Sequence, residues 1–167
     1  MSLPLAAIGA VIAALLETSV ASELTVAGFK PDLIYVFAVV SAMIIGAEEG
    51  LVWAFLGGLM LDVLSPERPI GATMLSLLLV VGLAIAIARL LGPSRLLISV
   101  VAAFVLTWLY QLTVLAVLSA TSGLAVTGLP LRAAIPVALM NGLLAIAVAL
   151  VARWAMIRFG PPERVDW

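Results

Sequence analysis

The side chains in this sequence that could do acid–base chemistry are a few carboxylates set among long apolar runs. Glu48 and Glu49 stand at the start of one run, Asp62 stands near its end, and Glu17 stands near the end of another. Within one helix Asp62 would lie about 21 Å along the axis from Glu48, which excludes a catalytic pair of carboxylates. We interpret Glu48 and Glu49 as solvated groups in a first helical turn, where the helix dipole favours negative charge.

Asp62 and Glu17 are the two carboxylates that could lie away from the ends of an apolar helix. No basic residue stands mid-run to pair with them, and a proton relay or ion site needs more than two isolated acids. For Asp62, a solvated position and a buried one both stay open. Gln111 and Asn141 are uncharged and could hydrogen-bond across the last two helices, a contact worth about 1 kcal/mol in lipid.

Other catalytic and cofactor chemistry is excluded by what the sequence lacks. It contains no cysteine and no histidine, which rules out thiolate chemistry, imidazole catalysis and the usual zinc and haem sites within this chain. It shows no nucleophile–base arrangement, no carboxylate cluster with metal spacing and no phosphate loop. The net charge is −1 without a basic run, which argues against nucleic acid as a partner. We predict no enzymatic activity and no cofactor.

The composition is that of a membrane protein. Of the 167 residues, 65% are hydrophobic and 10% are charged, whereas soluble proteins carry about 25% charged residues. We predict an all-α, multi-pass membrane protein with one membrane-embedded domain, 1–167. The apolar runs predict a bundle of six transmembrane helices, at about 3–21, 31–46, 48–64, 72–91, 96–118 and 133–157.

The expected orientation follows from the basic residues. Six spans place both termini on one side, which then carries five arginines, while the other side carries Lys30, Arg68 and Arg132. The positive-inside rule therefore favours cytoplasmic termini. No Lys or Arg precedes the first apolar run, so a signal peptide would lack its basic region. We expect that run to be a retained helix.

Two stripes of small residues run along the predicted helices, and such a stripe lets a second helix approach closely. At about 100° per residue, the members of each stripe share one helix face. The alanine stripe, which leads to Glu17, consists of Ala6, Ala10 and Ala13. The glycine stripe, which leads to Leu61, consists of Gly50, Ala54 and Gly57. Each stripe is either packing inside the bundle or a docking face for a partner helix.

A set of short motifs lies between Lys30 and Leu83. They are Lys30-Pro31-Asp32-Leu33, Glu48-Glu49-Gly50-Leu51-Val52-Trp53, Gly57-Gly58-Leu59, Leu61-Asp62-Val63-Leu64-Ser65 and Pro69-Ile70-Gly71. Together with Glu17 they resemble the rod shape-determining protein MreD family. The segments after Leu83 agree with the family in size and hydropathy. The departure is the Pro-Glu-Arg insert at 66–68, where the family is expected to have a shorter glycine-containing turn.

The resemblance implies a protein of the bacterial cytoplasmic (inner) membrane that serves cell elongation and peptidoglycan synthesis. It implies a fold similar to the six-helix S components of energy-coupling-factor transporters. The implied partners are MreC, a single-span protein with an extracytoplasmic domain, and, more indirectly, RodA, a class B penicillin-binding protein and MreB. No catalytic residue is implied. The expected mechanism is scaffolding: the bundle holds the transmembrane helix of MreC on one of the two stripes and helps to regulate the cell-wall synthase.

Two other functions stay open at this point. A substrate-binding S component of a vitamin importer would share the architecture and could dock through the alanine stripe, but the sequence offers few polar groups to orient a ligand. An ion or proton transporter would rest on Glu17 and Asp62 alone.

Overall fold

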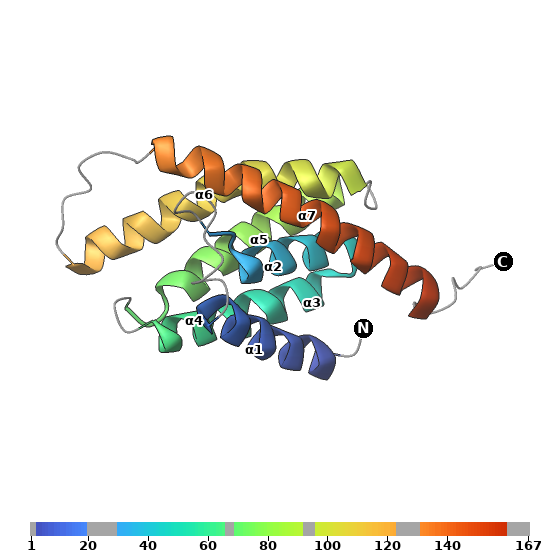
Figure 1. The fold of residues 1–167 in the computed structure, drawn as a ribbon, viewed down its shortest axis with the longest axis horizontal. Helices are drawn as coiled ribbons and strands as arrows, with labels where there is room; N and C mark the ends of the chain where they lie inside the picture. Colours follow the sequence, from blue (N-terminus) through green and yellow to red (C-terminus); the bar gives the residue numbers. More distant parts are fainter. Residues whose placement is uncertain (1–2, 20–29, 66–68, 92–95, 123–130, 160–167) are drawn as a thin grey trace.

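A computed structural model describes residues 3–19, 30–65, 69–91, 96–122 and 131–159, and the regular elements in these ranges are helices. They are α1 (Leu3–Ser19), α2 (Leu33–Ile44), α3 (Ala47–Val52), the π-helical η1 (Trp53–Gly57), α4 (Gly58–Leu64), α5 (Ala72–Leu91), α6 (Leu96–Ser122) and α7 (Leu131–Phe159). The prediction of an all-helical fold is confirmed for these ranges, and the long apolar helices are consistent with a membrane protein. Elements α3, η1 and α4 follow one another without a break and form one rod with a π turn inside it (Figure 1).

Three helices are long and apolar enough to cross a membrane, over Ala72–Leu91, Leu96–Thr121 and Ala134–Arg158. Two shorter apolar helices occupy Leu3–Ser19 and Leu33–Ile44. With 12 residues, α2 is about 18 Å long, less than the roughly 30 Å of a hydrocarbon core. Six full crossings therefore stay a prediction. Figure 1 shows that α1 begins and α7 ends at the same end of the bundle.

Helix α2 lies at the centre of the bundle. It packs against α1, α3, η1, α5, α6 and α7, and most of its residues are buried. In Figure 1, α6 and α7 lie on one side of α2, while α1 and the α3–η1–α4 rod lie on the other. The sequence explains this position, because a helix that is apolar on every face is stable only when its surroundings are apolar on every side.

The rod returns antiparallel to α2 after a tight turn. The N–H groups of Ile45 and Gly46 both donate to the carbonyl oxygen of Ser41, at 2.9 Å. The two backbones then meet at Gly50, where a Cβ atom would overlap the Cβ of Ala42 and lie 2.6 Å from its Cα. Only a residue without a side chain permits this approach, so Gly50 sets the distance between α2 and the rod.

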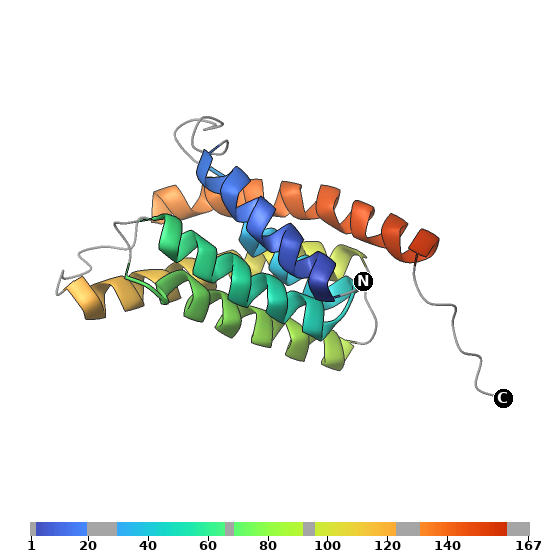
Figure 2. The ribbon, with the colours of Figure 1, turned by 90° about the horizontal axis from the view of Figure 1, so that it is seen from below.

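The rod also packs closely against α1 and α5. A Cβ atom at Gly9 of α1 would lie 3.0 Å from the ring of Trp53, and that ring stacks on Phe37 of α2 with centroids 4.9 Å apart. On the α5 side, a Cβ atom at Gly58 would lie 2.6 Å from the Cα of Met74. Figure 2 shows α1 crossing one side of the rod and α5 running along the other. Small residues thus bring three neighbours against this one rod.

Candidate functional site

Asp62 of α4 caps the N-terminus of α5. Its Oδ2 accepts the N–H groups of Gly71 and Met74 at 2.9 and 3.1 Å, and its Oδ1 accepts the N–H of Thr73 at 2.9 Å. Asp62 as a whole is 2% exposed. The first N–H groups of a helix have no partner within the helix, and the dipole favours negative charge there. Of the two positions that the sequence left open for Asp62, the structure has the buried one.

Glu17 does the same for α2. It stands near the end of α1, is 5% exposed, and its Oε2 accepts the N–H of Ile34 at 2.8 Å. Because α2 begins inside the bundle, water cannot accept hydrogen bonds from its first N–H groups. A side chain from another helix must accept them instead. Glu17 thereby joins α1 to the central helix.

Asn141 of α7 joins the start of α2 to α6 and α7. Its Oδ1 accepts the N–H of Asp32 at 2.9 Å, while its Nδ2 donates to Asp32 Oδ2 at 3.2 Å and to Thr107 Oγ1 at 3.4 Å. The side chain is fully buried. The sequence indicated that Asn141 and Gln111 could hydrogen-bond across the last two helices. Asn141 does so with Thr107 of α6, and it also binds the N-cap residue of α2.

Tyr35 provides a second link between α2 and α6. Its hydroxyl donates to the carbonyl oxygen of Ala103 at 2.6 Å, and its ring stacks on Tyr110 with centroids 5.0 Å apart. Thr107 donates to the same carbonyl oxygen at 2.8 Å. Sequence reasoning missed Asp32, Thr107 and Tyr35 as members of one cluster. The available signal was that each is a polar residue within or beside an apolar helix.

The candidate site is therefore a buried polar core around the first turn of α2, built from α1, α2, α6 and α7. Its groups hydrogen-bond to one another and to backbone atoms. Among the described residues, one buried side-chain atom, Ser99 Oγ, has no hydrogen-bond partner. No group of three or more acidic, cysteine or histidine residues in those ranges could hold a metal ion. This arrangement fixes helices against one another, because its acceptors are occupied by backbone N–H groups and by side-chain donors of neighbouring helices.

Both small-residue stripes lie inside the bundle. The members of the alanine stripe are buried in α1, beside Glu17. The glycine stripe faces α2: Gly50 meets Ala42, and a Cβ atom at Gly57 would lie 2.6 Å from Ile34 Cγ2. Of the two interpretations that the sequence left open, this burial favours packing inside the bundle, because a partner helix could reach these residues only by displacing a helix of the bundle. A helical wheel identifies a close-packing face but not which neighbour packs on it.

Glu48 and Glu49 lie in the first turn of α3, as the sequence indicated. Glu48 is exposed and Glu49 is half-buried. The carboxylate of Glu49 folds back over Gly46, with Oε2 2.6 Å from the position that a Cβ atom of that glycine would take. These two carboxylates lie at the end of the bundle where α1 begins, away from the polar core.

We expect Glu17→Ala to lower the free energy of unfolding by about 1–3 kcal/mol, because the buried Ile34 N–H would lose its acceptor. Glu17→Gln should lose less, since its amide oxygen can still accept that N–H. Thermal unfolding in detergent, followed by circular dichroism, measures both. The exposed Glu48→Ala is the matched control, and a Glu17→Ala protein as stable as this control would show that the cap contributes nothing.

The sequence was compared with models of known protein families, with curated proteins and with solved structures. A family model described as the rod shape-determining protein MreD matches residues 3–156. The match therefore covers α1 to α6 and most of α7. Comparison with curated proteins and with solved structures gave no match.

Proposed function

The chain belongs to the rod shape-determining protein MreD family, and from that premise we propose that it is a non-catalytic scaffold of the bacterial cell-elongation machinery. The family supports a role in rod shape determination and is a shape-determining, structural one. In the proposed role the protein lies in the cytoplasmic membrane with both termini in the cytoplasm. It binds MreC directly and helps to regulate peptidoglycan synthesis by RodA and its class B penicillin-binding partner, with MreB reached indirectly.

The observation that supports scaffolding is how the bundle uses its buried polar groups. Asp62 joins α4 to α5, Glu17 joins α1 to α2, and Asn141 joins α7 and α6 to α2. Fully satisfied polar groups in a low-dielectric interior favour one helix arrangement over others. A framework held in this way is suited to keep a partner's helix, and the domain attached to it, in a constant position.

The two rival functions lose the features that suggested them. For a vitamin-importer S component, the alanine stripe was the candidate docking face, and that stripe is buried under the rod and α2. The likeness to the S-component fold stays a prediction. For an ion or proton transporter, Glu17 and Asp62 were the candidate carriers, and both bind helix N–H groups. Ion flux in proteoliposomes that is lost in Glu17→Gln would restore the transporter as a candidate.

The first test of the proposal is affinity purification of the tagged protein from native membranes in mild detergent. Co-purification of a stoichiometric single-span protein with a coiled-coil region is the expected result. Recovery of a transmembrane coupling subunit with ATPases instead would contradict the scaffold and favour an importer.

Burial of both stripes moves the proposed docking surface to an outer face of the bundle. Large apolar side chains are exposed on the helices that surround α2. Examples are Ile8 on α1, Phe55 on η1, Leu79 on α5, Val105 on α6 and Leu143 on α7. These residues mark the faces that a transmembrane helix of MreC can reach without unfolding the bundle.

We expect single cysteines at some of these exposed positions to cross-link to a cysteine in the MreC transmembrane helix. The native chain has no cysteine, so each variant carries one defined thiol. Membranes are oxidised and the MreC adduct is detected on a gel. The buried Ala10→Cys is the matched control and should not cross-link. Adducts through Ala10 with none from the exposed set would return the docking face to the alanine stripe.

A further inference from the structure

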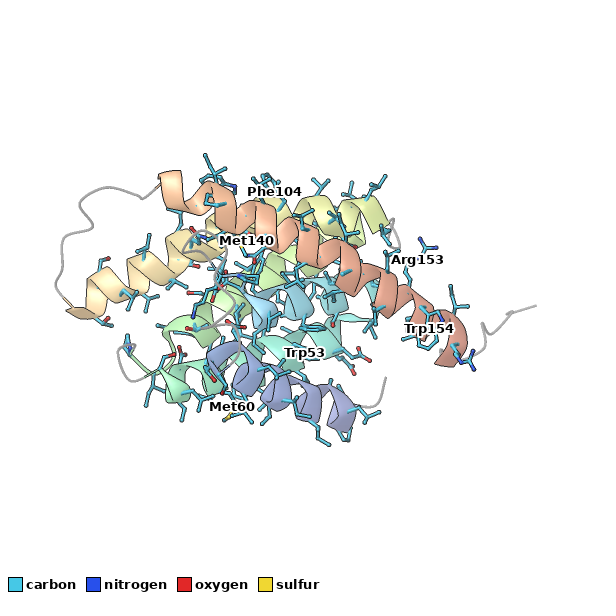
Figure 3. The ribbon with its side chains drawn as sticks, in the orientation of Figure 1. Trp53, Met60, Phe104, Met140, Arg153 and Trp154 are labelled. Atoms are coloured by element: carbon cyan, nitrogen blue, oxygen red, sulfur yellow. The ribbon has the colours of Figure 1, made fainter. Side chains whose placement is uncertain are left out.

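The half of α6 that follows the polar core leaves the packed bundle. Tyr110 is the last buried residue of this helix, and no side chain from 111 to 121 is buried. Helix α6 passes α7 near Phe104 (Figure 3), where a Cβ atom at Gly142 would lie 3.6 Å from the Phe104 ring. Beyond this point the two helices diverge, as Figures 1 and 2 both show. Residues 111–121, here called the outer half of α6, therefore offer side chains that the bundle does not bury.

The outer half of α6 suits apolar surroundings. No acidic or basic residue lies between Arg95 and Arg132. The hydroxyl groups of Thr113, Ser119 and Thr121 donate to backbone carbonyl oxygens of the preceding turn, at 2.8 or 2.9 Å. Because hydroxyl groups bonded in this way need no water, they can lie in lipid or against another helix.

The side chain of Gln111 is not satisfied in this way. Its amide carries two N–H donors and an acceptor oxygen, and it makes no hydrogen bond within the described part of the chain. The membrane-capable stretch of α6 is Leu96–Thr121. Its middle falls at Trp108 and Leu109, so Gln111 lies about 3 Å further along the axis. Lipid tails have no donors or acceptors, and an unpaired polar group at that depth is costly. The amide therefore marks a contact with a molecule outside the bundle.

Gln111 belongs to a face of α6 that is directed away from the bundle core. The buried residues on this part of the helix are Ala103, Leu106 and Tyr110. At about 100° per residue, the face directed away from them consists of Trp108, Gln111, Leu112 and Leu115. None of these four is buried, and Leu112 is 43% exposed. Their spacing of i, i+3, i+4 and i+7 is the pattern by which one helix contacts another. This set, here called the α6 docking face, is apolar except for one amide halfway along it.

We propose that the α6 docking face binds a transmembrane helix of a partner protein, and that Gln111 recognises an amide or hydroxyl side chain of that helix at the same depth. Lipid tails can cover an apolar face but leave the amide unpaired, whereas such a helix supplies apolar side chains and the missing donor or acceptor. A second copy of this chain in the same orientation fits less well, because Trp108 would meet its own counterpart beside Gln111. The inference rests on the proposed scaffold function for its partner and deepens it by assigning the partner helix to α6.

The test uses the full-length protein in phosphatidylcholine vesicles and two synthetic probes. One is a transmembrane peptide of leucines with a single glutamine at its centre, and the other has leucine there. Each carries a dansyl group, and energy transfer from the tryptophans of the protein measures binding at a lipid excess that keeps the peptides monomeric. Wild-type protein should bind the glutamine peptide about fivefold more tightly, the effect of one hydrogen bond between helices in lipid. Gln111→Leu should bind the two peptides equally.

Thr113→Val is the matched control. It removes a polar group two residues away, on the other side of the helix, whose hydrogen bond lies within α6, so it should keep the fivefold preference. Thermal unfolding should show both variants to be as stable as the wild-type protein. Equal binding of the two peptides by the wild-type protein would overturn the proposal, and so would a loss of preference in Thr113→Val. A dimer of the chain that Gln111→Leu dissociates would also overturn it, because the occupant would then be a second copy.

The same variants separate this inference from the scaffold function. In affinity purification from native membranes, Gln111→Leu should recover several-fold less MreC than the wild-type protein or Thr113→Val. Equal recovery with all three proteins would leave the scaffold intact and overturn the assignment of the partner helix to α6. Absence of MreC from all three would contradict the scaffold, and the peptide measurement alone would then decide whether the α6 docking face binds a helix.

Discussion

Replacing Asp62 with alanine is expected to lower the free energy of unfolding by about 3–5 kcal/mol, because two buried N–H groups and one part-buried N–H group lose their acceptor. Those donors belong to Gly71, Thr73 and Met74, at the start of α5. Asp62 and Thr73 are both buried, so water does not replace the carboxylate at this helix end. Because Asp62 belongs to the rod, its replacement removes both the cap of α5 and a contact between α5 and the rod. Helix α5 is one of the three membrane-capable helices.

The measurement is the melting temperature in detergent, which should fall by roughly 10 °C for a chain of this size. Asp62→Asn should give an intermediate loss, because it keeps one acceptor oxygen but directs an NH₂ group at N–H donors. Glu48→Ala, at an exposed position in the same rod, should not change the melting temperature. If Asp62→Ala and Glu48→Ala have the same melting temperature, the cap is not a stabilising element of the fold.

Gly50→Ala is expected to destabilise the protein by about 2–3 kcal/mol, although alanine is the better helix former. The added methyl group would overlap the Cβ of Ala42 and lie 2.6 Å from its Cα and 2.8 Å from its nitrogen. Two of these three atoms are backbone of the central helix, so relief requires α2 and the rod to move apart. That movement would loosen the remaining contacts of α2.

Gly82→Ala is the matched control for this prediction, with the opposite sign. Gly82 lies in the middle of α5, is exposed, and a Cβ atom there would meet no atom within 4 Å. Removal of glycine from a helix interior should stabilise the protein by about 0.5–1 kcal/mol. Unfolding of both variants in the same detergent gives the comparison. Destabilisation of equal size in both would contradict the prediction, because it would show that the α2–rod contact is not the cause of the loss.

Much of this protein was predictable from local sequence. The short motifs between Lys30 and Leu83 identified the family, and the match over residues 3–156 confirms it. Helix α5 has the predicted bounds, because Gly71 precedes it and Gly92-Pro93 follows it. Such signals act within a few residues of each other along the chain, so they are present before any tertiary contact forms.

The π turn and the exact extent of the central helix were not predictable in this way. The sequence WAFLG of η1 carries no local signal for wider hydrogen bonding. The turn lies between Gly50, which meets α2, and Gly58, which meets α5. Helix α2 begins at Leu33 and ends at Ile44, inside the predicted range 31–46, because its ends are set by caps from Glu17, Asn141 and the tight turn to the rod.

By itself the sequence determined the membrane class, the helical elements, the family and the positions of close helix packing. The tertiary structure alone decided where the carboxylates and the two stripes point. The physical reason is that the helices are apolar on both their inner and outer faces, so polarity does not distinguish bundle interior from lipid. The partners also come from distant parts of the chain, as with Asp32 and Asn141, which lie 109 residues apart. Only packing could bring each orphaned N–H group to its acceptor.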